Sequence, residues 1–407
     1  MKVLELFAGA GGAAIGLEAA GLEHLACVEW DEDACATMRA AGLPAVQGDV
    51  RDLSLYEGMS PDLLWSSFPC QAWSTAGGRK GAEDPRNGWP WTVDVIDFLA
   101  PEWFIGENVV GLTNHKGECK GGSRCIGLPR CPNAYFNEVI LKDLRRHYDW
   151  VGWTILDSAD FGVPQRRRRV FVVGGPHPIK WPETTHQDPG GAQQSLFALA
   201  KKPWNTVGKA LGLTALRGVQ LDGGRNSDNN PSQERPHTLK EPAPAINGRG
   251  NQMLRVIGGG RNPQSKEVLH KRNYRDLTDE PCTTIPAAQI GNAGPWVVAG
   301  SRPELLDRPS PTVTTTEVKG TRGRHMGKVM KNGKRSGGVD RASDAVWLAT
   351  GRRRLTIEEC AKLMDFPDGY PFQGSTKKSR YSQVGNAVTP IVAQRIAEQV
   401  LLAQKGE

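Results

Sequence analysis

Short apolar runs alternate with helix-patterned segments through the first 175 residues of this 407-residue chain. This alternation is typical of a doubly wound α/β sheet whose strands are mostly parallel. The predicted strands are residues 3–7, 25–30, 63–68, 103–106, 153–156 and 170–174. The predicted helices are residues 13–20, 32–41 behind an N-cap at Asp31, 93–99 and 134–147. We therefore expect one α/β domain over residues 1–175.

The character of the sequence changes between residues 176 and 351. Pro, Gly, Asn and Arg dominate, short β-like pieces recur and no sustained helical period is present. This composition predicts a second, loop-rich and mainly β domain. Helical texture returns over 352–407, where Thr356 to Glu359 form a predicted capping box and Pro390 opens a last helix that ends near Gln404.

Composition excludes several classes of protein. No run of eighteen apolar residues is present, so we expect no membrane span, and the acidic Glu5 interrupts the first apolar stretch, which argues against a secretory signal. Eight scattered cysteines are too few for a disulfide scaffold. We expect a cytoplasmic protein, and its net charge of +7 suits a polyanionic partner.

A glycine-rich turn follows the first predicted strand. It reads Phe7, Ala8, Gly9, Ala10, Gly11, Gly12, which lacks the G-x-G-x-x-G spacing of a phosphate cradle. An acidic residue ends each of the next two apolar stretches. Glu29, followed by Trp30, ends the first, and Asp49 ends the second. Glu29 is placed to accept ribose hydroxyls, Trp30 to pack on an adenine and Asp49 to bind its amino group. An adenosine ligand without phosphates, such as S-adenosylmethionine, fits this pattern, whereas a tight turn without a ligand is the alternative.

Nucleophilic and acidic side chains follow two later strands. Cys70 lies between Pro69 and Gln71 in a polar loop, and Glu107 ends another strand at the same predicted edge of the sheet. A lone cysteine is more often a core residue, but a core residue is not expected in a polar loop. Arg167 and Arg169 lead into the predicted strand at residues 170–174, and strand alternation places both side chains on one face.

The order of these motifs resembles that of the DNA (cytosine-5) methyltransferases. The resemblance covers about residues 1–175 and 352–395 and rests on five motifs. They are Phe7 to Gly12, Pro69-Cys70-Gln71, Glu107-Asn108-Val109, Gln165-x-Arg167-x-Arg169, and Gln383 to Val388. The resemblance implies a class I, Rossmann-like catalytic domain over 1–175, a target recognition domain over 176–351, and a return of 352–407 to the catalytic domain. It also implies that Asn386 and Val388 complete the cofactor site.

The resemblance implies a mechanism as well. A cytosine leaves double-stranded DNA, Cys70 adds to ring carbon 6 and Glu107 protonates ring nitrogen 3. Arg167 and Arg169 hold the base oxygen and a phosphate, and carbon 5 takes the methyl group of S-adenosylmethionine. An RNA cytosine-5 methyltransferase and a DNA-binding regulator with residual activity are the alternatives.

Two further groups of residues carry expectations about ligands. We expect Gln71 and Ser74, in the loop that carries Cys70, to contact DNA. We expect the same of a run of basic residues with no acidic residue among them, which are Lys319, Arg322, Arg324, Lys328, Lys331, Lys334 and Arg335. An insertion after Val109 groups three cysteines and a histidine, which predicts a structural zinc site at His115, Cys119, Cys125 and Cys131. Its C-x5-C-x5-C spacing differs from usual zinc modules, so a basic loop with incidental thiols is the alternative. We expect the protein to act as a monomer.

Overall fold

The protein forms two compact units. The computed structural model describes residues 1–69, 84–113, 131–188, 201–212 and 355–407, together with the backbone of short strands between 219 and 354. One unit comprises Met1–Asn205 and Ala361–Glu407, and the other comprises Thr206–Cys360. The first unit thus includes residues 176–205, which the sequence pattern groups with the loop-rich region.

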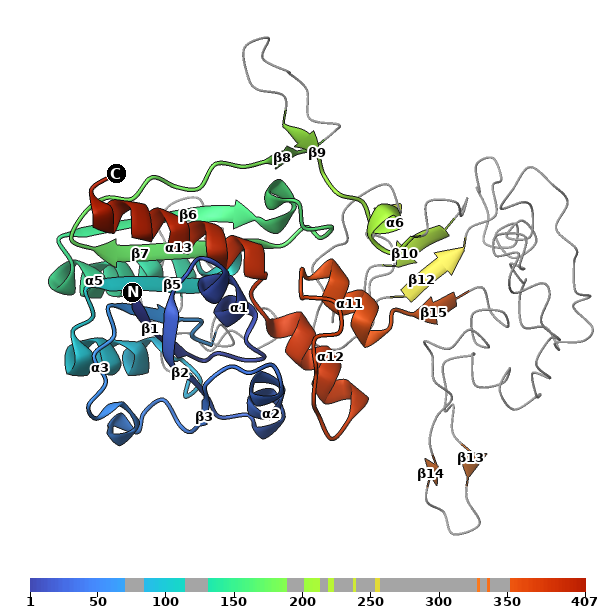
Figure 1. The fold of residues 1–407 in the computed structure, drawn as a ribbon, viewed down its shortest axis with the longest axis horizontal. Coiled ribbons are helices and arrows are strands. Elements are labelled where there is room, and N and C mark those ends of the chain that lie inside the picture. Colours follow the sequence, from blue (N-terminus) through green and yellow to red (C-terminus); the bar gives the residue numbers. More distant parts are fainter. Residues whose placement is uncertain are drawn as a thin grey trace, which may run out of the picture. The chain divides into compact units, whose positions relative to one another are not determined.

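A seven-stranded sheet forms the centre of the first unit, in the order β3-β2-β1-β4-β5-β7-β6 (Figure 1). Its strands are β1 (Lys2–Leu6), β2 (Glu23–Glu29), β3 (Ala45–Gln47), β4 (Leu63–Ser66), β5 (Trp103–Val109), β6 (Trp150–Asp157) and β7 (Arg168–Gly175). Strand β7 runs antiparallel to both of its neighbours, whereas the pairs from β3 to β5 are parallel. The predicted doubly wound, mostly parallel sheet is therefore confirmed, with β3 as an added strand of three residues.

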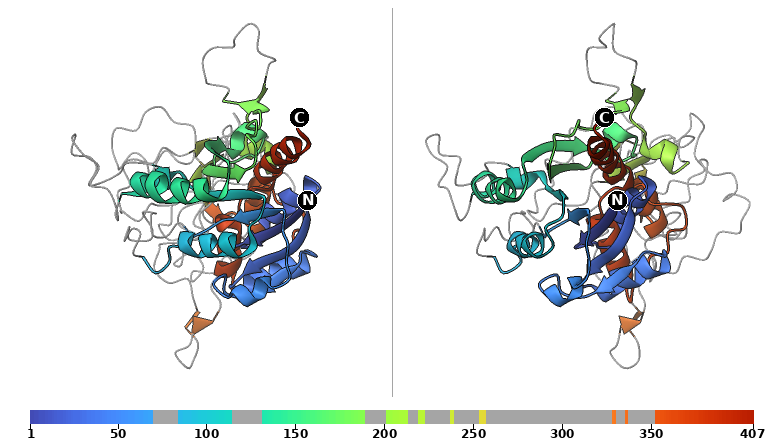
Figure 2. Two further views of the ribbon diagram at one scale, coloured as in Figure 1. Left: turned by 90° about the vertical axis from the view of Figure 1, so that its left-hand side faces the viewer. Right: turned by 60° about the vertical axis from the view of Figure 1, so that its left-hand side comes forward.

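Helices cover both faces of this sheet (Figures 1 and 2). On one face, α1 (Gly12–Ala19) and α13 (Pro390–Lys405) pack on Trp65, Ile105 and Phe171. On the other face, α3 (Trp89–Leu99) and the segment from α4 (Pro132–Tyr135) to α5 (Leu141–His147) pack on apolar side chains such as Leu4 and Phe104. A π-helical turn, η6 (Phe136–Ile140), interrupts the helix that the sequence predicts over 134–147.

Two predicted helix starts agree with the observed caps, whereas the helix predicted over 93–99 begins earlier, at Trp89. Asp31 Oδ1 accepts a hydrogen bond from Ala34 N at 2.8 Å and opens α2 (Glu32–Ala40). At the start of α11 (Ile357–Leu363), Glu359 N donates to Thr356 Oγ1 at 3.0 Å and Thr356 N donates to Glu359 Oε2 at 2.9 Å. These reciprocal bonds form the predicted capping box. The remaining C-terminal helix before α13 is α12 (Lys377–Asn386).

Short strands make up most of the described part of the second unit. A four-stranded sheet has the order β11-β10-β12-β15, with β10 (Val219–Asp222), β11 (His237–Thr238), β12 (Met253–Val256) and β15 (Arg352–Arg354). A separate pair joins β13 (Lys328–Val329) to β14 (Arg335–Ser336) in antiparallel register. A four-residue helix, α6 (Val207–Ala210), opens the unit.

Small extra elements complete the described chain. Three 3-10 turns are η1 (Leu53–Tyr56), η4 (Val110–Thr113) and η7 (Ser158–Phe161), and two short parallel strands are β8 (His186–Gln187) and β9 (Lys202–Pro203). In the part of the chain that the structure describes, no helix is long and apolar enough to cross a membrane.

Glycines let α13 approach α1 closely. A Cβ atom added at Gly16 would lie 2.1 Å from the carbonyl oxygen of Pro390, and one at Gly12 would lie 2.3 Å from that of Val388. Both distances are far below van der Waals contact, so any larger residue would push the two segments apart. This close packing brings residues 387–390, from the end of the chain, beside the glycine turn that follows β1.

Candidate active site

The turn after β1 is held in an uncommon backbone conformation by a buried carboxylate. Phe7, Gly9 and Gly11 have φ values of 55°, 57° and 82°. Glu29, at the end of β2, accepts hydrogen bonds from Gly9 N at 2.8 Å and from the backbone of Trp30 and Asp31 at 2.9 and 3.0 Å. Burial raises the pKa of the Glu29 carboxyl, while these three donors act in the opposite direction. Glu29 therefore ties the first two strand ends together.

Open space and an exposed ring adjoin this turn. A Cβ atom at Gly9 would meet nothing within 4 Å. The side chain of Trp30 is 81% exposed, so one face of a large aromatic ring is free to pack on a planar ligand. These features fit an adenosine group at the ends of β1 and β2.

Asp49 lies two residues after the end of β3, and it already has a partner. Its carboxylate forms an ion pair with Arg51, which lowers the pKa of Asp49, and the Arg51 guanidinium lies 5.1 Å from the centre of the Trp91 ring. Trp91 in turn stacks on Phe7, with ring centroids 6.4 Å apart. The glycine turn, α3 and the end of β3 are thus linked through these side chains.

The C-terminal segment closes the other side of the glycine turn. Tyr370 donates a hydrogen bond from its hydroxyl to the carbonyl oxygen of Ala10 at 2.6 Å. Val388 is buried and its carbonyl oxygen faces Gly12, while Asn386, the last residue of α12, is exposed. The structure therefore places Val388 directly beside the turn, with Asn386 two residues before it in the chain.

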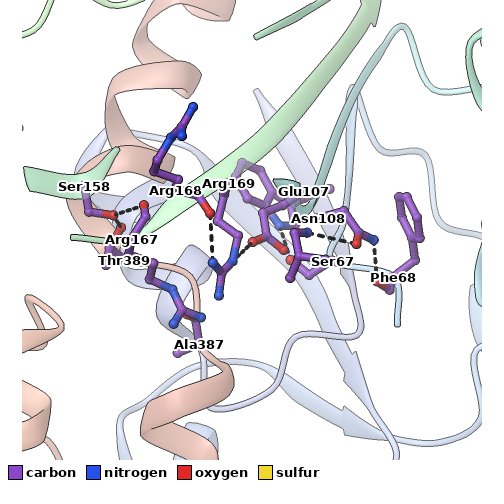
Figure 3. A network of polar contacts seen from close by, with 12 residues as sticks. Ser67, Phe68, Glu107, Asn108, Ser158, Arg167, Arg168, Arg169, Ala387 and Thr389 are labelled. Atoms are coloured by element: carbon purple, nitrogen blue, oxygen red, sulfur yellow. Dashed lines mark hydrogen bonds and ion pairs between the residues drawn. The ribbon is translucent and has the colours of Figure 1, made fainter. Parts of the chain in front are cut away.

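The nucleophile loop begins at the end of β4. Asn108 donates from Nδ2 to the carbonyl oxygen of Phe68 at 3.0 Å and accepts at Oδ1 from Val109 N at 2.9 Å (Figure 3). Pro69 is partly buried, and Gly88 leaves room for it, because a Cβ atom there would lie 2.4 Å from the proline ring. Cys70, Gln71 and Ser74 lie outside the described residues. Asn108 therefore fixes the chain two residues before Cys70.

Glu107 and Arg169 form an ion pair across β5 and β7, in which Glu107 is buried and Arg169 is partly buried. Arg169 Nε lies 3.0 Å from Glu107 Oε1, and Glu107 is 8% exposed (Figure 3). Burial raises the pKa of the Glu107 carboxyl, whereas Arg169 and then Arg167 act against this shift. A carboxyl group whose pKa is raised remains a proton donor closer to neutral pH. The pair thus combines an acid and a fixed cation at one point of the sheet.

Arg167 has a different environment from Arg169. It is 3% exposed, and its Nη2 donates to the carbonyl oxygen of Ala387 at 2.7 Å (Figure 3). Its backbone is held on both sides, because its N–H donates to Asp157 Oδ1 at 2.9 Å and its carbonyl oxygen accepts from Ser158 N at 3.1 Å. Ser158 Oγ also shares a hydrogen bond with Thr389 Oγ1 at 2.8 Å. Arg167 therefore joins the start of β7 to residues 387–389.

Most residues of the two remaining predicted groups lie outside the described part. His115, Cys119 and Cys125 are among them, and Cys131 is buried and accepts a hydrogen bond at Sγ from Ala134 N at 3.4 Å, which caps α4. In the basic run, Lys328 and Arg335 lie on β13 and β14, where only the backbone is described. The other five basic residues lie outside the described residues.

Sequence reasoning missed the residues that support the predicted ones. Asp157, Ser158 and Thr389 hold the backbone around Arg167, and Trp91 packs on Phe7. Because Ser158 and Thr389 are 231 positions apart, no local pattern relates them. Asp157 directly precedes a turn, and its N-cap position on η7 is the one signal that sequence could have offered.

Comparison with known proteins agrees with this geometry. Residues 1–402 match the family described as C-5 cytosine-specific DNA methylase. Type II methyltransferase M1.HphI of Haemophilus parahaemolyticus is 29% identical over all of this chain and 88% of its own length. Type II methyltransferase M.AplI of Arthrospira platensis is 27% identical over all of this chain and 87% of its own length. The crystal structure of the S. pombe Dnmt2 methyltransferase, at 17% identity and full coverage of both chains, shares the fold with a TM-score of 0.51.

The family match spans both units and includes every motif that the site brings together. The chain belongs to the C-5 cytosine-specific DNA methylases, enzymes that transfer a methyl group from S-adenosylmethionine to carbon 5 of cytosine in DNA.

Proposed function

We propose that Glu107 and Arg169 form the binding site for a flipped-out cytosine and that Cys70 attacks it. The observation that supports this assignment best is the 3.0 Å ion pair between buried Glu107 and partly buried Arg169. Glu107 lies on β5, the strand next to β4, and β4 leads to Cys70. A cation beside a buried acid provides both of the groups that a cytosine ring needs, a partner for its oxygen and a proton for its nitrogen. Arg167 acts through its contact with Ala387, as a positioning residue.

The reaction then proceeds through a covalent adduct between Cys70 and the cytosine. The Cys70 thiolate adds to carbon 6, and ring nitrogen 3 takes a proton from Glu107, so that carbon 5 becomes nucleophilic. Carbon 5 forms a bond to the methyl group, and the bond between that methyl group and the sulfonium breaks. Loss of the carbon 5 proton to a base then expels the thiolate, and return of the nitrogen 3 proton to the Glu107 carboxylate restores both the ring and the acid.

The cofactor contacts follow from the turn after β1. S-adenosylmethionine supplies the methyl group, and Glu29 would receive its ribose hydroxyls, Trp30 would stack on its adenine and Asp49 would accept its amino group. Since Glu29 already accepts from three backbone donors and a carboxylate offers about four acceptor positions, binding of both ribose hydroxyls would replace one of these three bonds. The backbone of residues 7–12, Pro69, Asn386 and Val388 would enclose the rest.

A methylation assay tests this proposal directly. Purified protein, labelled S-adenosylmethionine and unmethylated duplex DNA should yield labelled 5-methylcytosine on nucleoside analysis, while RNA of the same sequence should not. Glu107→Gln keeps the shape of the side chain but removes the acid, and should lower kcat by about 10²–10⁴. Glu102→Gln, an exposed carboxylate at the start of the same strand region, is the matched control. Labelling of RNA alone would favour the RNA enzyme, and binding without turnover would favour the regulator.

The second unit would recognise the target sequence on double-stranded DNA. The one-signed basic run on and around β13 and β14 suits phosphate contact, which carries no sequence information. Replacement of Lys328, Lys331 and Lys334 with Ala should weaken binding to all DNA and lower the salt slope by up to about 0.9 per lost contact. The methylated sequence should stay the same. A change in the methylated sequence would show that these lysines take part in sequence recognition and would refute their assignment to phosphate contact alone.

The cellular setting is part of the same proposal. The relatives are named Type II methyltransferases, which supports a role in restriction-modification beside a companion nuclease. We place the enzyme in the cytoplasm as a monomer, and size-exclusion chromatography with light scattering tests the oligomeric state.

The insertion after Val109 carries the zinc hypothesis. Its four residues are His115, Cys119, Cys125 and Cys131, and Cys131 is the one that the structure describes. Because its sulfur already caps α4, it would have to serve both the cap and the metal. Metal content of Cys119→Ser/Cys125→Ser against the parent protein decides whether the insertion holds zinc.

A further inference from the structure

A buried group of three chemically reactive side chains lies away from the catalytic residues. Glu5 on β1 and Cys27 on β2 are register partners, and both are almost fully buried, at 1% and 0% exposure. The side chain of His24 is 1% exposed, and one ring nitrogen, Nε2, lies 3.5 Å from Glu5 Oε2. Nothing in the methyl transfer uses these residues.

A β-bulge brings the three side chains to one face of the sheet. His24 and Cys27 are three positions apart on one strand, so regular alternation would send them to opposite faces. The register between β1 and β2 shifts by one residue between Val3 and Leu4, because Val3 pairs with His24 and Leu4 pairs with Ala26. The extra residue, Leu25, turns His24 to the same side as Cys27 and Glu5. Bulges that redirect a side chain in this way are typical of functional positions.

The three polar groups do not satisfy one another within the protein. Neither ring nitrogen of His24 has a hydrogen-bond partner, and the contact between Cys27 Sγ and Glu5 Oε2 is long, at 4.0 Å. Burial raises the pKa of the Glu5 carboxyl, an effect that His24 opposes, and burial together with the nearby Glu5 charge raises the pKa of the Cys27 thiol. Buried groups with so few partners are costly unless a cation compensates them.

The spacing matches the edges of a tetrahedral zinc site. Ligand distances of about 2.0–2.2 Å for oxygen and nitrogen and about 2.3 Å for sulfur give edges of about 3.4 Å between N and O and about 3.6 Å between S and O. The observed edges are 3.5 and 4.0 Å, and all three donor atoms lie within 4.8 Å of one another. A thiolate, a carboxylate and a neutral imidazole around Zn²⁺ also give a site of zero net charge.

We propose that Glu5, His24 and Cys27 bind a structural zinc ion behind the cofactor turn. The ion would join β1 to β2 two residues before Phe7 and two residues before Glu29, and so fix the two strand ends that carry the cofactor residues. A fourth position is left for water or the second Glu5 oxygen. Glu18 lies on the far side of His24, with Oε1 3.8 Å from Nδ1, and would orient the imidazole as metal-bound histidines require.

Metal analysis of the full chain tests the proposal. Protein purified without chelator is measured by plasma mass spectrometry, as are Cys27→Ser and His24→Asn. Cys35→Ser is the matched control, because Cys35 is also buried but its Sγ donates to the carbonyl oxygen of Glu29 at 3.2 Å. The first two variants should lose about one equivalent of zinc, and the control should keep it. Cys119→Ser/Cys125→Ser should keep this equivalent too, which separates the site from any metal in the insertion.

Cobalt keeps the proposal testable if the variants fold poorly. The parent protein, stripped of metal and titrated with Co²⁺, should show a thiolate-to-cobalt charge-transfer band that the Cys119→Ser/Cys125→Ser protein retains. Absence of that band in the double variant, or zinc contents of Cys27→Ser and His24→Asn equal to that of the parent, would overturn the proposal and leave a buried ion pair only. Neither result bears on whether the protein methylates cytosine.

Discussion

Gly16→Ala should separate α1 from α13 and destabilise the catalytic unit. The added Cβ atom would lie 2.1 Å from Pro390 O, 2.9 Å from Gln394 N and 3.0 Å from Ala393 Cβ. Two of these neighbours are backbone atoms, so no side-chain rotation relieves the contact and one helix must move by about 1 Å or more. Overpacking of this kind costs about 1–3 kcal/mol, and we expect the upper end.

The higher helix propensity of alanine offsets part of this loss in the free energy of unfolding. Alanine is favoured over glycine inside a helix by about 1 kcal/mol, and Gly16 lies in the middle of α1. The net loss in the free energy of unfolding should therefore be about 2 kcal/mol, measured by urea denaturation of the full chain. Gly111→Ala is the control, because the nearest atom to its Cβ would be Val109 Cγ2 at an ordinary 3.7 Å. A Gly16→Ala protein as stable as the parent would refute the close packing of α1 on α13.

Three further predictions follow from individual contacts. Burial raises the pKa of the Glu107 carboxyl in the folded protein. The contribution of the protonated carboxyl to stability is therefore complete below the unfolded pKa of about 4.3 and is lost as pH rises through the folded pKa. The Tm of Glu107→Gln should exceed that of the parent near neutral pH and not at pH 4. Ser158→Ala and Thr389→Val should show a coupling free energy of about 0.5–1.5 kcal/mol in a double-mutant cycle, since each removes one end of a buried 2.8 Å hydrogen bond, and additive effects would contradict this. Trp30→Ala should change unfolding by less than about 0.5 kcal/mol because the ring is exposed, yet weaken S-adenosylmethionine binding, in a calorimetric titration, by about 0.5–1.5 kcal/mol.

Local signals predicted most of the first unit. Strand and helix periods, the Asp31 cap and the Thr356–Glu359 capping box depend on neighbouring residues, and all were visible in sequence. The π-helical turn at Phe136–Ile140 was not predicted, because such turns are rare and occur as single-turn interruptions of an α-helix. The antiparallel direction of β7 was equally hidden, since a buried strand has the same composition in either direction.

The candidate site was predictable in its residue types but not in its contacts. Glu29, Glu107 and Arg169 stand at strand ends, where open α/β sheets place ligands. Strand alternation put Arg167 and Arg169 on one face, yet β7 begins at Arg168, and Arg167 lies before it against Ala387. Contacts between distant segments depend on the packing of α13 on α1, which no sequence period encodes.

The most direct test of the account is covalent trapping at Cys70. Duplex DNA that carries 5-fluorocytosine in the methylated sequence cannot lose a carbon 5 proton, so the adduct should persist and migrate with the protein in a denaturing gel. We expect this complex with the parent protein and S-adenosylmethionine, and none with Cys70→Ala. Peptide mapping should find the modification on Cys70. A denaturant-resistant complex formed equally by Cys70→Ala would contradict the proposed mechanism.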